Sequence, residues 1–481
     1  MRVRIAIFAV VTIAVFCFFQ FWYSYHFFYY EQNQIFLWEW EYVSGYFQRV
    51  GGFASLMGDF LTQFYYYLYA GSVILTLCIA MAGVLLYKLL TNLKVSSWVA
   101  IALGLSLMFF LTVCHFSKSY KLSSTICILG WLLTFWLVSR IFGVRGCRGT
   151  GIVFMLVLLP AYLLFGMPKA VRLQSPDLVL EKDFAVSNEY HFGNYDKVLN
   201  IVGSSDGWTR QMMFFYNLVY AHRGELPDHL LDFIPNNLGT FEKIGPETPR
   251  LTIINMNELY WALGDMTFTE RAAMMTNVFA PENRNVRMIK RLAECNIVSG
   301  DSAAAQKYLR ILSKTFAYKH WADETQMLLS KGQLPPYLAQ KKPFVNHHDT
   351  ITISDNAHFL MMQLLDANPG NTIALDYILC STLLLKDIQN FKRDYDRYCM
   401  ETAKPRLKKL YQEALCIWLA GTNAPQEEWQ RYVQRQDVLR RFIEYNNQRG
   451  NPRFKDTYWY YYDKMKAPEI YGQSSSGLRP K

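Results

Sequence analysis

The feature that most constrains the fold of this chain is a series of long runs without a charged residue in its first third. Five such runs occur, at residues 5–30, 60–87, 95–117, 122–139 and 149–168. A helix that crosses a bilayer needs about 20 apolar residues, and a helix can satisfy its own backbone hydrogen bonds in hydrocarbon. The sequence therefore predicts a transmembrane domain over residues 1–168 with five spans.

The basic residues between these runs predict the orientation of the helices. One side would carry seven of them: Arg2, Arg4, Lys88, Lys94, Arg140, Arg145 and Arg148. The other side would carry three: Arg49, Lys118 and Lys121. Because cytoplasmic loops are enriched in Lys and Arg, the N-terminus is expected in the cytoplasm. Five spans then place everything after about Pro168 outside it.

The first run is expected to stay in the protein as a membrane anchor. Phe21-Trp22-Tyr23 follows it, where a cleaved signal peptide would have small residues.

The charge distribution separates the chain into two parts and excludes nucleic acid as a partner. Residues 1–168 hold ten Lys and Arg against four Asp and Glu, whereas residues 169–481 hold 39 against 35. Thus +6 of the +10 net charge lies in the apolar third. Positive charge there orients helices in a bilayer, so it does not indicate phosphate binding.

All four acidic residues of the first third fall in the outer loop 31–59: Glu31, Glu39, Glu41 and Asp59. Within it, Ile35, Trp38, Tyr42, Tyr46 and Phe47 are at helical spacing. This spacing predicts an amphipathic helix over about residues 34–53 on the outer leaflet, ended by a turn at Gly51-Gly52.

Two interpretations of the loop acids remain open. Glu31 and Asp59 are candidates for a catalytic base or metal ligand, because glycosyltransferases that use polyprenyl-phosphate sugars carry an acidic residue just after their first span. The other interpretation, which we favour, is that these acids are solvated and only match an outer loop. Such enzymes usually have more than five spans.

Beyond the membrane domain, a tight turn between two helical segments recurs. It is centred on Gly193, Gly224, Gly264, Gly300 and Gly421, with Lys386 in a version without glycine. Successive turns are 31, 40, 36, 86 and 35 residues apart, which brackets the roughly 34-residue period of helical-hairpin repeats. An irregular helical domain with chance glycine turns is the alternative. The pattern predicts an all-α protein in which about five transmembrane helices precede an α-solenoid.

The repeats divide the outer part into segments. A juxtamembrane linker is expected at 169–185, repeats at 186–330, a loop at 331–356, and repeats with an aromatic cap at 357–462. A tail at 463–481 would end disordered. The segment 292–309 resembles a tetratricopeptide repeat, with Gly300 in its turn, and Asn368-Pro369 looks like the start of another.

No motif indicates a metal or cofactor site. His347, His348, Asp349 and His358 lie together in the sequence but lack ligand spacing, so a solvated loop is favoured. The outer cysteines are Cys295, Cys380, Cys399 and Cys416. Cys380 and Cys416 could pair, but free buried thiols are favoured because Cys behaves as a small hydrophobe on an apolar helix face.

Several segments together resemble an uncharacterised bacterial family of multi-pass membrane proteins with a helical-repeat outer domain. They are Glu31 to Leu37, Gly51-Gly52-Phe53, Phe60 to Phe64, Asn368 to Asn371 and Lys386-Asp387. The resemblance implies a bacterial inner membrane and a periplasmic C-terminal domain. It implies no activity.

The favoured function is therefore that of a membrane scaffold or adaptor, whose outer domain binds a protein on its concave face. An enzyme is the less favoured class. The alternatives are a lipid-linked glycosyltransferase-like enzyme that uses Glu31 or Asp59, and an accessory subunit of a transporter.

Overall fold

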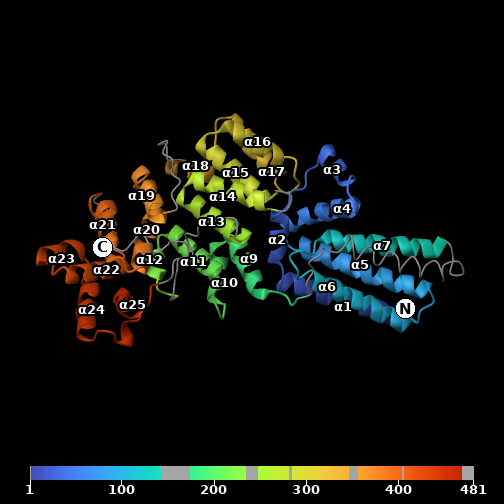
Figure 1. Ribbon diagram of the computed structural model, residues 1–481, viewed down its shortest axis with the longest axis horizontal. Coiled ribbons are helices and arrows are strands. Elements are labelled where there is room, and N and C mark those ends of the chain that lie inside the picture. Colours follow the sequence, from blue (N-terminus) through green and yellow to red (C-terminus); the bar gives the residue numbers. More distant parts are fainter. Residues whose placement is uncertain are drawn as a thin grey trace. The chain divides into compact units, whose positions relative to one another are not determined.

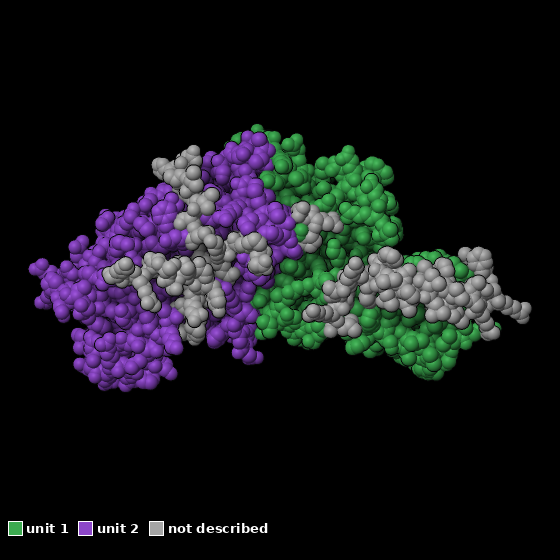
Figure 2. All heavy atoms as spheres, viewed as in Figure 1, with its two compact units in different colours: residues 1–184, 280–290, 306–332 green, residues 185–279, 291–305, 333–481 purple. Residues whose placement is uncertain are grey.

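The computed structural model describes residues 2–141, 174–233, 248–280, 284–345, 356–402 and 406–467, and these residues are all-helical, without a strand (Figure 1). The predicted fold class, all-α, is confirmed for them. They form two compact units (Figure 2). Unit 1 contains residues 1–184, 280–290 and 306–332, and unit 2 contains 185–279, 291–305 and 333–481.

Among the described residues of unit 1, four helices are long and apolar enough to cross a membrane: α1 (Arg2–Phe21), α5 (Ala70–Asn92), α6 (Ser97–Cys114) and α7 (Leu122–Ile141). Each falls within or overlaps one of the first four predicted runs. The fifth predicted span, 149–168, lies outside the described residues, as does the predicted boundary at 168.

The helices found in the first two runs have other bounds than the predicted spans. The run 5–30 holds two helices, because α1 ends at Phe21 and the short helix α2 (Tyr25–Gln32) follows after a turn. The start of the run 60–87 belongs to α4 (Gly52–Thr62) and the 3₁₀ helix η1 (Gln63–Tyr66). Charge-free length alone cannot detect such breaks, since aromatic residues such as Tyr23 and Tyr65 are as buried as the aliphatic ones.

The apolar helices contact one another through small residues. A Cβ on Gly83 of α5 would lie 2.5 Å from Cγ of Met108, and one on Gly104 of α6 would lie 2.8 Å from the carbonyl oxygen of Gly83. Glycine at both positions lets the two backbones approach closely, as is common between membrane helices.

Unit 1 also contains helical segments that are far away in the sequence. They are the first residues of α15 (Val286–Ser299), the end of α16 (Ser302–Leu312) and α17 (Lys319–Ser330). The outer loop contributes α3 (Trp40–Tyr46) and α4.

Successive helices from α9 onward form pairs joined by the predicted turns. The first helix of four pairs has 14 residues: α9 (Leu178–His191), α11 (Arg210–Arg223), α13 (Arg250–Leu263) and α15. Their partners are α10 (Tyr195–Gly203), α12 (Leu226–His229), α14 (Met266–Phe279) and α16. Gly193, Gly224, Gly264 and Gly300 stand between the members of the pairs with positive φ, which glycine adopts without strain.

The second block of helices follows the same plan with other turn residues. It comprises α19 (Ala357–Ala367), α20 (Thr372–Leu384), α21 (Ile388–Tyr395), α22 (Lys409–Gly421), α23 (Gln426–Tyr432), α24 (Gln436–Asn447) and α25 (Tyr458–Lys464). Lys386 has φ of +60° in the turn after α20, as the version without glycine predicts. Gly421, however, lies within α22, and Asn423 takes the left-handed conformation in its place.

Two further predictions concern the rest of unit 2. The predicted loop 331–356 includes two short helical turns, α18 (Pro336–Ala339) and η3 (Lys342–Phe344). The aromatic run in α25 is a core element, because Tyr458, Trp459 and Tyr461 are buried. The four outer cysteines are also buried, as predicted.

A buried ion-pair network lies at the centre of unit 2. Nη2 of Arg291 is 2.7 Å from Oε2 of Glu258, and its Nη1 is 3.0 Å from Oε2 of Glu294. The guanidinium also lies 4.3 Å from the ring centroid of Trp261. Both carboxylates and the guanidinium are almost fully buried, so Arg291 compensates much of their charge, while His191 also contacts Glu258 and the hydroxyl of Tyr337 donates to Glu294.

Candidate functional site

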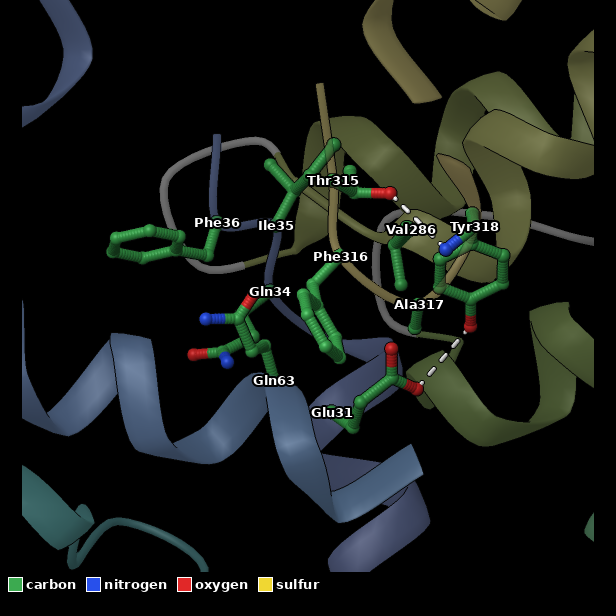
Figure 3. Close-up of a pocket in the computed structure, with 10 residues that line it drawn as sticks. All are labelled: Glu31, Gln34, Ile35, Phe36, Gln63, Val286, Thr315, Phe316, Ala317 and Tyr318. Carbon is green, nitrogen blue, oxygen red and sulfur yellow. Dashed lines mark hydrogen bonds between the residues drawn. The ribbon is translucent and has the colours of Figure 1, made fainter. Parts of the chain in front are cut away.

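Glu31, one of the two predicted candidates, is buried near the end of α2 (Figure 3). It lines a small pocket together with residues from η1 and from residues 313–318, which connect α16 to α17. The pocket residues are Glu31, Gln34, Ile35, Phe36, Gln63, Val286, Thr315, Phe316, Ala317 and Tyr318. The interpretation of the loop acids as solvated is therefore wrong for Glu31.

The carboxyl group of Glu31 has one specific partner. The hydroxyl of Tyr318 donates a hydrogen bond to Oε2 of Glu31 at 3.3 Å, whereas the second oxygen takes no hydrogen bond from the residues that the structure describes (Figure 3). Burial raises the pKa of Glu31 from 4.5 to about 8, although the Tyr318 hydroxyl favours the charged form. A carboxyl with this pKa exchanges its proton near neutral pH.

The amide of Gln63 adds a second polar group to the pocket. Its Nε2 donates to the carbonyl of Phe60 at 2.8 Å. Its Oε1 is buried without a hydrogen-bond partner among the described residues. The aromatic ring of Phe316 stands between the glutamine side chains and Glu31 in the close-up (Figure 3). The site thus combines two acceptor oxygens with an aromatic wall.

Asp59, the other predicted candidate, has a different role. Its Oδ2 accepts a hydrogen bond of 2.7 Å from the hydroxyl of Tyr46, which is 2.7 Å from the hydroxyl of Tyr42. Asp59 is half-buried and does not line the pocket. Its carboxylate therefore joins α4 to α3, and the structure does not bring it to Glu31.

The outer loop is held by the connection between α16 and α17. The backbone N–H of Trp38 donates to the carbonyl of Lys314 at 2.9 Å, and Nζ of Lys314 lies 2.9 Å from Oε1 of Glu39. The ring of Phe316 contacts that of Phe64 at a centroid distance of 5.1 Å. Residues 34–39 form no helix, so the predicted helix over 34–53 is wrong; α3 forms within this range and α4 begins at Gly52.

The start of α15 contacts the end of α2 through polar side chains. Nδ2 of Asn285 donates to Oδ1 of Asn33 at 3.2 Å, and Nη1 of Arg287 donates to Oε1 of Gln32 at 3.2 Å. All four residues are buried. The end of α2 is thus hydrogen-bonded to residues that lie more than 250 positions later in the chain.

The beginning of α2 is capped by a distant carboxylate. Glu181 of α9 accepts hydrogen bonds from the backbone N–H groups of Tyr25 and His26, the latter at 3.2 Å. Burial raises the pKa of Glu181 to about 8 and lowers that of His26 to about 3. These two groups satisfy a helix end, which is a structural role.

Sequence reasoning missed Lys314, Phe316 and Tyr318 as partners of the loop. They lie in a short aromatic segment, Lys314-Thr315-Phe316-Ala317-Tyr318, that belongs to neither helix of a repeat pair. The long interval of 86 residues between turns was the signal that an unusual segment lies there. The histidines His347 and His348 and Asp349 lie outside the described residues, and His358 pairs with Asp394 at 3.2 Å.

The model of one protein family matches the chain over residues 1–175 and 168–465, and its description is "family of unknown function (DUF6057)". No curated protein and no solved structure matches the chain.

Proposed function

Since the chain belongs to the DUF6057 family, we propose from its geometry that the protein is a membrane-anchored scaffold whose outer helical-repeat domain binds another protein. The resemblance to an uncharacterised family is thereby confirmed. The bacterial inner membrane, the five spans and the periplasmic outer domain remain part of this proposal.

The observation that carries the proposal is the regularity of the helix pairs from α9 to α16. Four first helices of 14 residues each end at a glycine with positive φ, and a second helix follows directly. Stacked pairs of this kind form an α-solenoid, whose extended concave surface is typically used to bind proteins.

Photo-crosslinking in intact cells tests the scaffold. A benzophenone amino acid would be placed at exposed positions of the repeat helices, such as Met274 of α14 and Phe359 of α19. We expect discrete adducts with one protein at a subset of these positions. The control is the same probe at Lys94, between two apolar helices, which should not yield that adduct. A lack of protein adducts throughout the repeats would contradict the proposal.

A second candidate function is an outer-leaflet enzyme that uses Glu31. The observation favouring it is the pocket, which is lined by Glu31, with one carboxyl oxygen that takes no hydrogen bond among the described residues, and by Gln63. Complementation of a deletion strain by Glu31→Gln distinguishes the two functions, with Asp59→Asn as the second variant. Loss of function at normal membrane abundance would favour the enzyme, and retained function the scaffold. A lost general base typically lowers a rate by about 100-fold or more.

A further inference from the structure

The segment from α3 to the start of α4 exposes an unusually apolar surface for a loop. Its exposed large apolar residues are Trp38, Trp40, Phe47, Val50 and Phe53, and the polar residues Glu41, Gln48 and Arg49 are exposed beside them. Trp40 is 77% exposed and Val50 is 95% exposed. Scattered exposed apolar residues are normal, but five within 16 positions, including two tryptophans, indicate a surface that another apolar medium covers.

The place of this segment in unit 1 limits what that medium can be. α4 packs against the start of α7, where a Cβ on Gly58 would lie 2.8 Å from Cα of Ser123. Figure 1 shows α4 alongside the first turns of α7, with α3 on its other side. Gly52 precedes Gly58 by six residues, which corresponds to about 9 Å along the helix. The turn before α4 is thus displaced from Gly58 along the flank of α7, whose own exposed side chains include Leu133 and Leu137.

Part of the backbone of the turn is hydrogen-bonded within the segment. The backbone N–H groups of Phe47, Arg49 and Gly52 donate to the carbonyls of Ser44, Tyr46 and Arg49. Gly51 has φ of +74°, and a Cβ on Gly52 would lie 1.8 Å from the carbonyl oxygen of Tyr46, so this tight turn requires glycine. Each N–H group paired in this way lowers the cost of placing the turn in an apolar medium.

Side chains inside the segment are arranged in the same way. The hydroxyls of Tyr42 and Tyr46 and the carboxylate of Asp59 form a chain of hydrogen bonds between α3 and α4. The five large apolar side chains are exposed by contrast, which is more apolar surface than a loop in water usually shows.

We propose that α3, the turn at Gly51 and the start of α4 form a hairpin that inserts into the outer leaflet of the bilayer. Tryptophan and phenylalanine are the residues that lie best at the boundary between headgroups and acyl chains. Arg49 at the turn can extend its guanidinium to the phosphate layer while its stem stays among apolar groups. The segment leads into α4, which packs against α7, one of the four helices in the described residues that are apolar enough to cross a membrane.

Lipid crosslinking in native membranes tests this hairpin on the full-length protein. A benzophenone amino acid at Val50 should form adducts with phospholipid on illumination, detected by the mass shift of the peptide. The side chain at this position is almost fully exposed, so the substitution should not disturb folding. The same probe at Trp40 is a second, independent position.

The matched control is the same probe at Gln326, which is exposed on α17 in the same unit. Lipid adducts at positions 40 and 50, together with no lipid adduct at position 326, support the hairpin. Adducts with a protein at position 50 would instead make this surface a protein interface and overturn the proposal. Absence of any adduct at both test positions would also overturn it, because the segment would then face water.

Discussion

The hydroxyl of Tyr318 donates a hydrogen bond to the carboxyl of Glu31, and the two residues are 287 positions apart in the sequence. This bond lies within one compact unit, which contains both the apolar helices and residues 306–332. The bond shows that the acidic outer loop packs against a distant segment of the same chain. Glu31 is buried where that segment contacts the loop.

Replacing Glu31 with Gln should remove a pH dependence of stability. The folded carboxyl keeps its proton up to about pH 8, whereas in the unfolded chain it would lose it near its ordinary pKa of 4.5. Between these values the folded state binds more protons, so the contribution of Glu31 to stability is full below pH 4.5 and falls as the pH rises towards 8. In thermal unfolding experiments in nanodiscs, the stability of Glu31→Gln relative to that of the wild type should increase as the pH rises.

The gain in the free energy of unfolding of Glu31→Gln over the wild type is up to a few kcal/mol, since one unit of pKa corresponds to about 1.4 kcal/mol. Glu41→Gln is the control, because Glu41 is an exposed acid of the same loop and should leave the profile unchanged. If the difference in stability between the wild type and Glu31→Gln stays constant with pH, Glu31 does not have the raised pKa of a buried carboxyl.

Tyr318→Phe should loosen the segment that covers the loop. The ring remains on Tyr66, at a centroid distance of 5.3 Å, but the hydrogen bond to Glu31 is lost. We expect a loss of about 1 kcal/mol and faster limited proteolysis near residues 313–318. Lys314→Met is the matched control. Its ion pair with Glu39 is nearly half exposed, so its removal should cost about 0.5 kcal/mol or less.

Gly264→Ala should destabilise unit 2 more than Gly300→Ala. Both glycines have positive φ, so each alanine carries backbone strain of about 1 kcal/mol. A Cβ on Gly264 would also lie 2.4 Å from Cβ of Phe344, whereas no atom lies within 4 Å of one on Gly300. The melting temperatures of the two variants measure the difference, and equal values would show that Phe344 does not contact this turn.

Arg291→Met should be among the most destabilising changes in unit 2. It leaves Glu258 and Glu294 buried without the guanidinium that compensates them, at a cost of about 3–5 kcal/mol. The triple variant Glu258→Gln, Glu294→Gln, Arg291→Met removes all three charges. Denaturant unfolding should show recovery of most of the loss in the triple variant, and an equally unstable triple variant would argue against charge compensation as the cause.

The topology can be tested with reporters fused to the C-terminus. Five spans with a cytoplasmic N-terminus predict an extracytoplasmic reporter after Lys481, so alkaline phosphatase should be active there and a cytoplasmic fluorescent protein dark. The opposite pattern would mean an even number of spans. A fusion after Lys94 should report the cytoplasm in either case.

The helical class and the turns of the repeats could be predicted because both depend on local signals. Uncharged runs identify apolar helices, and Gly193, Gly224, Gly264 and Gly300 occupy turns that only glycine adopts freely. Gly421 is an exception among the glycines of the predicted turns. Asn423, two residues later, takes the positive φ, and a glycine that merely ends a helix looks the same in the sequence.

The candidate site was only half predictable. Glu31 was identified because glycosyltransferases that use polyprenyl-phosphate sugars carry an acid just after their first span, but its burial involves Tyr318 and Phe316, which no local pattern connects to it. For the same reason the helix predicted over 34–53 is wrong. Its apolar spacing is helical, yet residues 34–39 form no helix, and the backbone N–H of Trp38 donates to the carbonyl of Lys314. Tertiary contacts of this kind override a periodicity of only a few residues.

The bond between Glu31 and Tyr318 also sets an order of events during biosynthesis. Ribosomes add about 5–20 residues per second, so roughly 15 to 60 seconds separate the synthesis of the two residues. Throughout that interval the outer loop has already emerged, but its cover does not yet exist, and Glu31 faces solvent as an ordinary charged carboxylate. The chain must therefore acquire a proton at this position as it closes, and any factor that shields the loop in the meantime would act on a surface that the finished protein no longer shows.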